Sequence, residues 1–433
     1  MKRIFTLILV AVALLMPRVA TAQGYVPTEE ILKSREEFAD SKFGVFLHWG
    51  LYSMFAQGEW YMNRGIDSKE YAKSMHAFYP HRFDAAQWVS AIKAAGAKYI
   101  CFTSRHHEGF SMWDTKQSDY NIMNTPYGKD VIRQLADECH RQGIKLHLYY
   151  SHIDWTREDY PAGRTGRSTK SLDNPDWDGY YKFMNEQLKE LLTNYGEIGA
   201  IWFDGWWDHD SDSVPFDWQL PYQYELIHKL QPSCLVGNNH HQVPFEGEDI
   251  QIFERDVPGE NKAGLSGQAI SRLPLETCQT MNGMWGYKVA DQNYKSTAEL
   301  IRLLVQTSGK GANLLLNVGP QPDGTLPETA LSRLAEMGKW LETNGETIYG
   351  TQAGGYIEGD TLTTTRKDNR LFIHVLSDKV TRIDMPLEGK VKRVIDFAQK
   401  SALKYKFGKG RLTMDVAVPA DVADYIIEVE LKK

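Results

Sequence analysis

The sequence predicts an α/β protein in which an irregular (β/α)8 barrel, similar to a TIM barrel, is followed by a C-terminal antiparallel β-sandwich. Eight short apolar runs lie between residues 43 and 319, and each has the length of a buried strand. Helical patterns separate many of these runs, and such alternation is typical of a parallel sheet. After Tyr349 the pattern changes to segments in which apolar and polar residues alternate, as they do in antiparallel strands.

The number of runs and the length of the segment favour a closed barrel over an open doubly wound sheet. The predicted strands are residues 43–50, 98–106, 144–151, 200–205, 233–239, 250–254, 276–281 and 313–319. The predicted helices are residues 84–96, 130–143, 178–196, 222–231, 300–308 and a last one ending near 343. Residues 296–299 and 325–328 have the capping-box pattern, so we expect them to open the last two helices. No helical pattern fits between the fifth and sixth or the sixth and seventh strands, so we expect the barrel to be irregular there.

Six alternating segments, separated by turns such as Gly408-Lys409-Gly410, predict the C-terminal sandwich. They are residues 370–376, 380–386, 390–397, 402–407, 411–418 and 425–431. We place the domain boundary near residues 351–355. The barrel domain then comprises residues 23–350, and the sandwich comprises residues 351–433.

The N-terminal residues have the pattern of a secretory signal peptide. Lys2 and Arg3 precede an apolar run over residues 4–16, and small residues at 20–22 offer a cleavage site. The run is too short to cross a bilayer, so we expect residues 1–22 to be removed near Ala22 rather than to form a membrane span. The chain has no Asn-x-Ser/Thr acceptor, which favours a bacterial periplasmic or extracellular location over a glycosylated lysosomal one.

Composition excludes several partners and leaves others open. The net charge of −7 argues against nucleic acid and anionic membrane surfaces. No segment after the signal peptide has the length and apolarity of a membrane span. The four cysteines show no CxxC spacing, which favours core packing over redox or metal chemistry. The oligomeric state stays open.

The segment Ala200-Ile201-Trp202-Phe203-Asp204-Gly205 contains the most informative carboxylate of the chain. Asp204 ends an apolar run, and a buried carboxylate is costly unless it has partners or a function. Catalytic groups of parallel barrels lie at the carboxyl ends of the strands. The alternative is that Asp204 is a helix N-cap beside core tryptophans.

The ends of the other predicted strands also carry polar and ionisable groups. These groups are His48, Glu59-Trp60-Tyr61 in the following loop, Arg105-His106-His107-Glu108, Tyr149-Tyr150-Ser151-His152, Asn238-Asn239-His240-His241, and Glu254. Each has a structural explanation when it is taken alone, since a single histidine is more often a packing residue than a catalytic one. A barrel needs no such cluster in order to fold, so their gathering on one rim indicates a site.

The residue types at this rim favour carboxylate chemistry in an aromatic pocket that binds hydroxyl groups. Neither a GxSxG elbow, a Walker loop nor a dinucleotide fingerprint occurs. The histidines lack HExxH or zinc-finger spacing, so we predict no metal and no cofactor, with a metal hydrolase as the open alternative. What remains is typical of a glycosidase, with one carboxylate as nucleophile and one as general acid/base.

Asp204 is the predicted nucleophile and Glu254 the predicted acid/base. We expect Phe253 and nearby aromatics to raise the pKa of Glu254 by desolvation, and strand alternation to turn Arg255 aside. The alternative for Glu254 is a surface glutamate paired with Arg255. Glu276, expected at the opposite end of the barrel, and Glu59, in the first long loop, are the competitors for the acid/base role.

Several motifs together resemble the α-L-fucosidases of glycoside hydrolase family 29. They are FGVFLHWG, EWY, SRHHEGFSMWD, LHLYYS, WFDG, the ExxVP of residues 254–258, and ETCQTMNGMWGY, in order between Glu29 and Gly350. The resemblance implies an exo-acting, retaining enzyme that releases terminal α-linked L-fucose from an oligosaccharide or glycoconjugate by double displacement. It assigns Asp204 as nucleophile and, less directly, Glu254 as acid/base. The sugar-binding residues that it implies are His48, Glu59, Trp60, His106, His107, Tyr150, Trp202 and Trp285.

One segment departs from the family pattern. Where some members have an arginine after the fifth strand, this chain has Gly237-Asn238-Asn239-His240, which leaves the subfamily and the preferred linkage open. Two alternative functions also stay open. The first is a retaining glycosidase for a related sugar such as galactose, and the second is a catalytically silent carbohydrate-binding protein.

Overall fold

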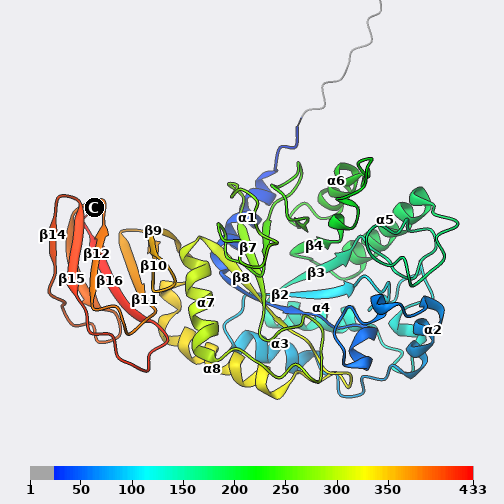
Figure 1. Ribbon diagram of the computed structural model, residues 1–433, viewed down its shortest axis with the longest axis horizontal. Coiled ribbons are helices and arrows are strands. Elements are labelled where there is room, and N and C mark those ends of the chain that lie inside the picture. Colours follow the sequence, from blue (N-terminus) through cyan, green and yellow to red (C-terminus); the bar gives the residue numbers. More distant parts are fainter. Residues whose placement is uncertain (1–23, 433) are drawn as a thin grey trace, which may run out of the picture.

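The computed structural model describes residues 24–432, so the predicted signal peptide lies outside the described residues. Eight parallel strands form one sheet in the order β5-β4-β3-β2-β1-β8-β7-β6. They are β1 (Phe43–Leu47), β2 (Tyr99–Arg105), β3 (Lys145–Ser151), β4 (Ala200–Asp204), β5 (Leu235–Asn239), β6 (Gln251–Glu254), β7 (Leu275–Thr280) and β8 (Ala312–Val318). A parallel bridge between Gly237 and Ile250 joins the two end strands, so the sheet is a nearly closed barrel. This confirms the predicted fold class and all eight strands. Figure 1 shows the barrel domain beside the C-terminal sandwich.

Helices surround the barrel. They are α1 (Glu29–Ser41), α2 (Ser68–Ala72), α3 (Ala85–Ala94), α4 (Val131–Gln142), α5 (Trp177–Asn194), α6 (Leu220–Leu230), α7 (Thr297–Gly309) and α8 (Glu328–Asn344). Among the described residues, no α-helix lies between β5 and β6 or between β6 and β7, which confirms the predicted irregularity. Helix α1 was not predicted. Its Phe38 packs on Tyr99 with ring centroids 5.4 Å apart, so α1 closes the end of the barrel at which the strands begin.

Only one of the two predicted capping boxes forms. The Ser296 side chain accepts a hydrogen bond from the backbone N–H of Glu299, and the Glu299 carboxylate accepts one from the backbone N–H of Ser296, so α7 begins as expected. Helix α8 begins after Pro327, which has no side chain that can cap it, and the Thr325 hydroxyl lies outside the cap position and donates to Asp323 (2.7 Å).

Strand alternation divides the hydrophobic residues of the barrel into two layers. Along β4, Ile201 and Phe203 pack toward the surrounding helices, whereas Ala200 and Trp202 belong to a separate cluster inside the barrel, drawn from all eight strands. Since side chains alternate, Asp204 also points inward, at the end where the strands finish. The inward layer thus leads directly to the predicted site.

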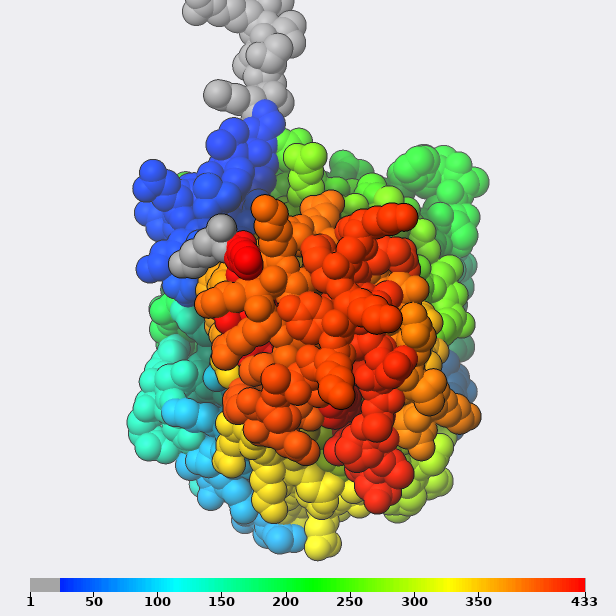
Figure 2. Space-filling view, turned by 90° about the vertical axis from the view of Figure 1, so that its left-hand side faces the viewer, coloured from blue at the N-terminus to red at the C-terminus, as the bar shows by residue number. Residues whose placement is uncertain are grey.

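The C-terminal domain is built from two antiparallel sheets. The first contains β9 (Gln352–Glu358), β10 (Leu362–Lys367), β11 (Arg370–Val375), β13 (Val391–Asp396) and β16 (Tyr425–Leu431), and the second contains β12 (Arg382–Pro386), β14 (Lys406–Gly408) and β15 (Arg411–Asp415). Residues of both sheets share one core that includes Ile373, Met385 and Val429. Strands β9 and β10 were not predicted, and they contact α7 of the barrel. Figure 2 shows the sandwich, in orange and red, covering one side of the barrel domain.

Among residues 24–432, no helix has the length and apolarity needed to span a membrane.

Candidate active site

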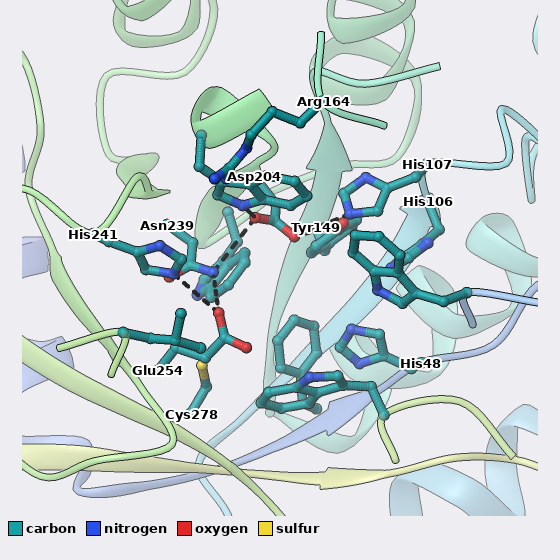
Figure 3. Close-up of a pocket in the computed structure, with 16 residues that line it drawn as sticks. His48, His106, His107, Tyr149, Arg164, Asp204, Asn239, His241, Glu254 and Cys278 are labelled. Atoms are coloured by element: carbon teal, nitrogen blue, oxygen red, sulfur yellow. Dashed lines mark hydrogen bonds and ion pairs between the residues drawn. The ribbon is translucent and has the colours of Figure 1, made fainter. Parts of the chain in front are cut away.

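A cavity of about 260 Å³ opens at the end of the barrel where the strands finish. Figure 3 shows Asp204 and Glu254 facing one another across it. The lining residues are Phe46, His48, Trp60, His106, His107, Tyr149, Arg164, Trp202, Asp204, Trp207, Asn239, His241, Glu254, Leu265, Cys278 and Trp285. They come from most of the strands and from several loops, so the closed barrel is what brings them together.

Asp204 is surrounded by hydrogen-bond donors. Its Oδ1 accepts from the backbone N–H of Gly205 (2.8 Å) and from Nε1 of Trp207 (3.0 Å), and its Oδ2 accepts from the Tyr149 hydroxyl (3.0 Å). Nε2 of His107 lies 3.6 Å from Oδ2. Burial and the nearby charge of Glu254 outweigh these donors and raise the pKa of Asp204 to about 6. The carboxylate is therefore fixed in direction while it faces the cavity.

Glu254 is held through one oxygen. Its Oε2 accepts from Nδ2 of Asn239 (2.9 Å) and pairs with Nε2 of His241 (3.1 Å). Burial raises the pKa of Glu254, but the hydrogen bond and charge of His241, the Asn239 bond and the charge of Arg255 together hold it below the ordinary value. The expectation that burial beside aromatic rings raises this pKa is thus wrong for the free protein.

Arg255 explains part of this difference. Its backbone has a φ of 64°, in the left-handed region, so the simple strand alternation ends at Glu254. The guanidinium lies over the Trp285 ring, 5.1 Å from its centroid, and its positive charge still lowers the pKa of Glu254. The prediction that Arg255 is turned aside without consequence is therefore corrected.

Asn239 joins the two carboxylates. Its Nδ2 lies 3.4 Å from Oδ1 of Asp204 and 2.9 Å from Oε2 of Glu254, as the dashed lines in Figure 3 show. These two contacts, 3.4 Å and 2.9 Å, limit the separation of the two oxygens to about 6.3 Å. Carboxyl groups of inverting glycosidases lie roughly 6.5–9.5 Å apart, and those of retaining ones roughly 5–5.5 Å apart. The pair is close enough to act on opposite sides of one bond.

Three buried histidines form the opposite wall. Burial lowers the pKa of His48 and of His107 to about 3, and lowers that of His106 well below its ordinary value, so all three are neutral near pH 7. Nδ2 of Asn317 donates to the Trp285 carbonyl (2.7 Å), so its Oδ1 accepts from Nδ1 of His48 (2.7 Å). This leaves Nε2 of His48 as a hydrogen-bond acceptor. Neutral imidazoles of this kind suit the recognition of hydroxyl groups.

Aromatic rings form the rest of the wall. Phe46, Trp202 and Trp285 belong to or pack against the cluster inside the barrel, and Tyr149 stacks on Trp202 with centroids 5.5 Å apart. Trp60 and Trp207 stack on one another nearer the mouth, 5.9 Å apart. The cavity is therefore apolar at its base and polar around the carboxylates.

Eight of the ten predicted site residues line the cavity, and Tyr150 and Glu59 do not. Tyr150 points outward, where its hydroxyl donates to Gln187 of α5 (2.8 Å), and Tyr149 takes the inward place. This corrects the prediction by one residue, and such a shift moves a strand side chain to the other face of the sheet. Glu59 is buried behind the wall, where it accepts from the backbone N–H of Gly286 (2.7 Å) and so secures the segment that carries Trp285.

The competitor Glu276 lies deeper in the barrel and does not line the cavity. Its two oxygens accept hydrogen bonds from the hydroxyl of Tyr99 (2.6 Å) and from Nε1 of Trp202 (2.8 Å). Burial raises its pKa to about 7. Glu276 is thus a support beneath the site rather than part of it.

The predicted set of site residues left out several lining residues, namely Phe46, Tyr149, Arg164, Trp207, Asn239, His241, Leu265 and Cys278, of which Tyr149, Asn239 and His241 were named only within the polar groups at the strand ends. The strand-end run Asn238-Asn239-His240-His241 carried a signal for two of them, because it follows β5 directly. The sequence contained no comparable signal for Arg164. Arg164 lies in the long segment between β3 and α5. Asp208 anchors this segment, because its carboxylate accepts hydrogen bonds from the backbone N–H groups of Gly163 (3.0 Å) and Thr165 (2.8 Å).

Within residues 24–432, no group of three or more His, Cys, Asp or Glu side chains is arranged to hold a metal ion. The four cysteines are buried and unpaired by disulfides.

Comparison with known proteins identifies the family to which this arrangement belongs. The sequence pattern of the family described as alpha-L-fucosidase matches residues 12–346, which is most of the chain. The chain belongs to the α-L-fucosidases of glycoside hydrolase family 29. Its predicted resemblance to that family is confirmed, and the chain is a glycoside hydrolase.

Two relatives show the extent of the similarity. The α-L-fucosidase of Dictyostelium discoideum is 31% identical over 379 residues, which cover 80% of this chain and 78% of the relative. The human plasma α-L-fucosidase is 29% identical over 371 residues, which cover 76% of this chain and 73% of the relative.

Solved structures agree with the fold. α-L-fucosidase isoenzyme 1 from Paenibacillus thiaminolyticus superposes with a TM-score of 0.82 and 33% identity, covering 93% of this chain and all of the other. A family 29 α-L-fucosidase from Bacteroides thetaiotaomicron, trapped as a covalent intermediate with 2-fluoro-fucosyl fluoride, has a TM-score of 0.79 and 24% identity, covering 96% and 98% of the two chains.

Proposed function

We propose that this chain is an exo-acting, retaining α-L-fucosidase that hydrolyses terminal α-linked L-fucose, with Asp204 as nucleophile and Glu254 as acid/base. The observation that carries the proposal is the carboxylate pair bridged by Asn239 inside one small cavity. The two oxygens that Asn239 bridges lie at most about 6.3 Å apart, and the carboxyl groups of retaining glycosidases lie roughly 5–5.5 Å apart. The covalent intermediate named for the Bacteroides thetaiotaomicron relative supports the same chemistry.

In the first step, Asp204 attacks the anomeric carbon while the glycosidic C–O bond breaks and Glu254 gives its proton to the leaving oxygen. The donors on Asp204 hold it at the angle of attack. In the second step, the Glu254 carboxylate takes a proton from water, and the resulting hydroxide displaces Asp204 from the anomeric carbon. Free fucose leaves with its anomeric configuration retained, Asp204 is again a carboxylate and Glu254 is again protonated.

The two carboxyl groups must carry one proton between them for this cycle to start. In the free pocket the charge of Glu254 raises the pKa of Asp204, so the pair titrates as a coupled system. The productive state has the proton on Glu254. Neutralising Glu254 also removes the repulsion that opposes ionisation of Asp204, so the two requirements support one another.

The cavity suits one 6-deoxy sugar. A volume of about 260 Å³ lies below the roughly 300–1,000 Å³ of pockets for drug-sized ligands, so a single ring fills it and the enzyme acts on chain ends. His48, His106 and His107 supply neutral partners for hydroxyl groups. The apolar base of Phe46, Trp202 and Trp285 suits a methyl group and disfavours the buried hydroxyl of a galactoside.

The experiment that tests this function is release of nitrophenol from 4-nitrophenyl α-L-fucoside and from the matching galactoside. We expect turnover of the fucoside and at least about tenfold lower kcat/KM on the galactoside. Preference for the galactoside would identify the related-sugar alternative, and turnover of neither would identify a binding protein. A panel of α1,2-, α1,3-, α1,4- and α1,6-linked fucosyl oligosaccharides then determines the linkage.

We also propose that the mature protein is exported to the periplasm or the extracellular space after cleavage near Ala22. The basic, apolar and small-residue pattern of the first residues supports this proposal. N-terminal sequencing of protein recovered from each cell fraction tests it.

A further inference from the structure

The loop that follows β5 brings a histidine onto the proposed acid/base. His241 has a φ of 61°, a left-handed conformation that residues other than glycine adopt rarely and that is enriched at functional sites. Its ring is 19% exposed, lines the cavity, and places Nε2 3.1 Å from Oε2 of Glu254. The unusual backbone is therefore coupled to a specific contact.

The neighbouring residue anchors this loop. Nε2 of His240 lies 3.0 Å from both oxygens of the buried Glu248, and the His240 ring stacks on Phe245 with centroids 4.1 Å apart. Glu248 also accepts from the hydroxyl of Tyr224 (2.8 Å) and from the backbone N–H of Phe245 (3.0 Å). Because these bonds secure the loop at His240, the position of His241 is determined by the fold.

The two oxygens of Glu254 are treated differently. Oε2 accepts hydrogen bonds from both Asn239 and His241. Oε1 accepts no hydrogen bond from any residue in the described range 24–432. Figure 3 shows both dashed lines meeting one oxygen of Glu254 while the other points into the cavity. One oxygen is thus used for orientation, and the other is left for the substrate.

We propose that His241 is a positioning residue for Glu254: together with Asn239 it fixes Oε2, so that Oε1 delivers the proton to the leaving oxygen. The inference rests on the proposed function. When Oε1 gives up its proton, the new carboxylate charge strengthens the N–H···O bond from His241, because hydrogen bonds to ionised acceptors are roughly twice as strong as neutral ones. When Oε1 later takes a proton from water, the same bond holds the base in place.

Other titratable or charged groups lie around Glu254 and His241, and they contribute to the pH dependence of the reaction. They are Asp204 on β4, Arg255 after β6, His48 directly after β1, Tyr149 on β3, Cys278 on β7, Glu59 in the first loop, and Arg164 and Asp210 at the mouth. All of them stay unchanged when His241 alone is replaced, so a difference between variant and wild type reports the histidine.

The test replaces His241 with Phe, which keeps a ring without a donor, and with Gln, which keeps an N–H donor. For His241→Phe we expect kcat/KM to fall on the order of 10²-fold on a phenyl fucoside or a fucosyl disaccharide, whose leaving groups need acid assistance. On 4-nitrophenyl fucoside, which needs little assistance, the fall should be within about threefold. His241→Gln should recover most of the loss. Val243→Ala, exposed in the same loop, is the matched control.

The pH profile separates positioning from a merely structural role. Because the His241 bond and charge lower the pKa of Glu254, their removal in His241→Phe should move the alkaline limb of kcat/KM to higher pH although the rate falls. Azide should restore kcat on the nitrophenyl fucoside, because an anionic nucleophile needs no base. Equal losses on all leaving groups with an unmoved limb would overturn the inference. Wild-type protein that fails to hydrolyse any fucoside would instead overturn the proposed function.

Discussion

Carboxylates occupy two levels inside the barrel, and their surroundings differ. At the lower level, Glu276 uses one oxygen for Tyr99 and the other for Trp202, and its exposed fraction is 1%. At the upper level, the side chains of Asp204 and Glu254 are 13% and 15% exposed. Oε1 of Glu254 accepts no bond from the described residues. Both levels lie in the same apolar interior, so burial alone does not distinguish them.

The two levels differ in whether a carboxyl oxygen is left without a hydrogen-bond partner in the protein. A buried polar group that is fully paired stabilises one arrangement of its neighbours, and Glu276 does this for the Trp202 ring at the base of the cavity. A carboxyl group with an open oxygen beside a cavity can accept a substrate or transfer a proton. The site therefore forms only where the strands end, since the loops there leave space above the inward layer.

The comparison is tested most strongly at Asp204. In Asp204→Gly the nucleophile is lost, so kcat on 4-nitrophenyl fucoside should fall by at least about 10³-fold while the thermal unfolding midpoint changes little. Azide should rescue turnover and yield a fucosyl azide of inverted configuration, which proton NMR identifies. A variant within tenfold of wild type would remove Asp204 from the nucleophile role.

Glu254→Ala should show a loss that depends on the leaving group. Without the acid, kcat/KM on fucosyl disaccharides should fall by about 10²–10⁴-fold, and the loss on 4-nitrophenyl fucoside should be far smaller. Steady-state kinetics on the two substrates measure the contrast. Losses of equal size on both would remove Glu254 from the acid/base role.

Tyr149 and Tyr150 of β3 allow a matched comparison, because Tyr149 points into the barrel and Tyr150 points outward. Tyr149→Phe removes a hydrogen bond to Asp204, so kcat should fall by about tenfold or more, consistent with a charge-assisted bond of about 1.5–3 kcal/mol. Tyr150→Phe removes a bond to Gln187 in α5 and should change stability while kcat stays within about twofold. The reverse result would place Tyr150, and not Tyr149, at the sugar.

Much of this arrangement could be predicted from the sequence, because it depends on local pattern. The eight barrel strands are short apolar runs, and Asp204 and Glu254 stand at the ends of two of them. The choice between Tyr149 and Tyr150 could not be made, since both precede a polar strand end and a shift of one residue exchanges the faces.

Other parts depend on contacts between distant residues. Strand β10 (Leu362–Lys367) contains three threonines and weak alternation, and it forms because β9 and β11 pair with it on either side. His241 reaches Glu254 only because β5 and β6 are neighbours at the junction of the barrel. These contacts form only when distant strands come together, so a local sequence pattern does not predict them.

The smallest expected effect concerns the lower level and appears in stability rather than in rate. Burial raises the folded-state pKa of Glu276 to about 7, whereas an unfolded glutamate titrates near about 4.3. Between these values the folded protein binds more protons than the unfolded one, so this group makes the free energy of unfolding fall as pH rises from about 4.5 to about 7. Glu276→Gln cannot ionise, so it should match wild type near pH 4.5 and gain up to about 3 kcal/mol relative to it by pH 8.

Urea unfolding at a series of pH values measures this difference. Asp204, whose pKa is also raised, contributes a slope of the same sign, but it is present in both proteins and cancels in the comparison. Activity on 4-nitrophenyl fucoside should change less than tenfold in Glu276→Gln, because Trp202 keeps an acceptor oxygen at the base of the cavity. Parallel stability curves for the two proteins would mean that Glu276 is already ionised within the fold. In that case burial would not keep Glu276 protonated, and its ionisation would resemble that of an exposed carboxylate.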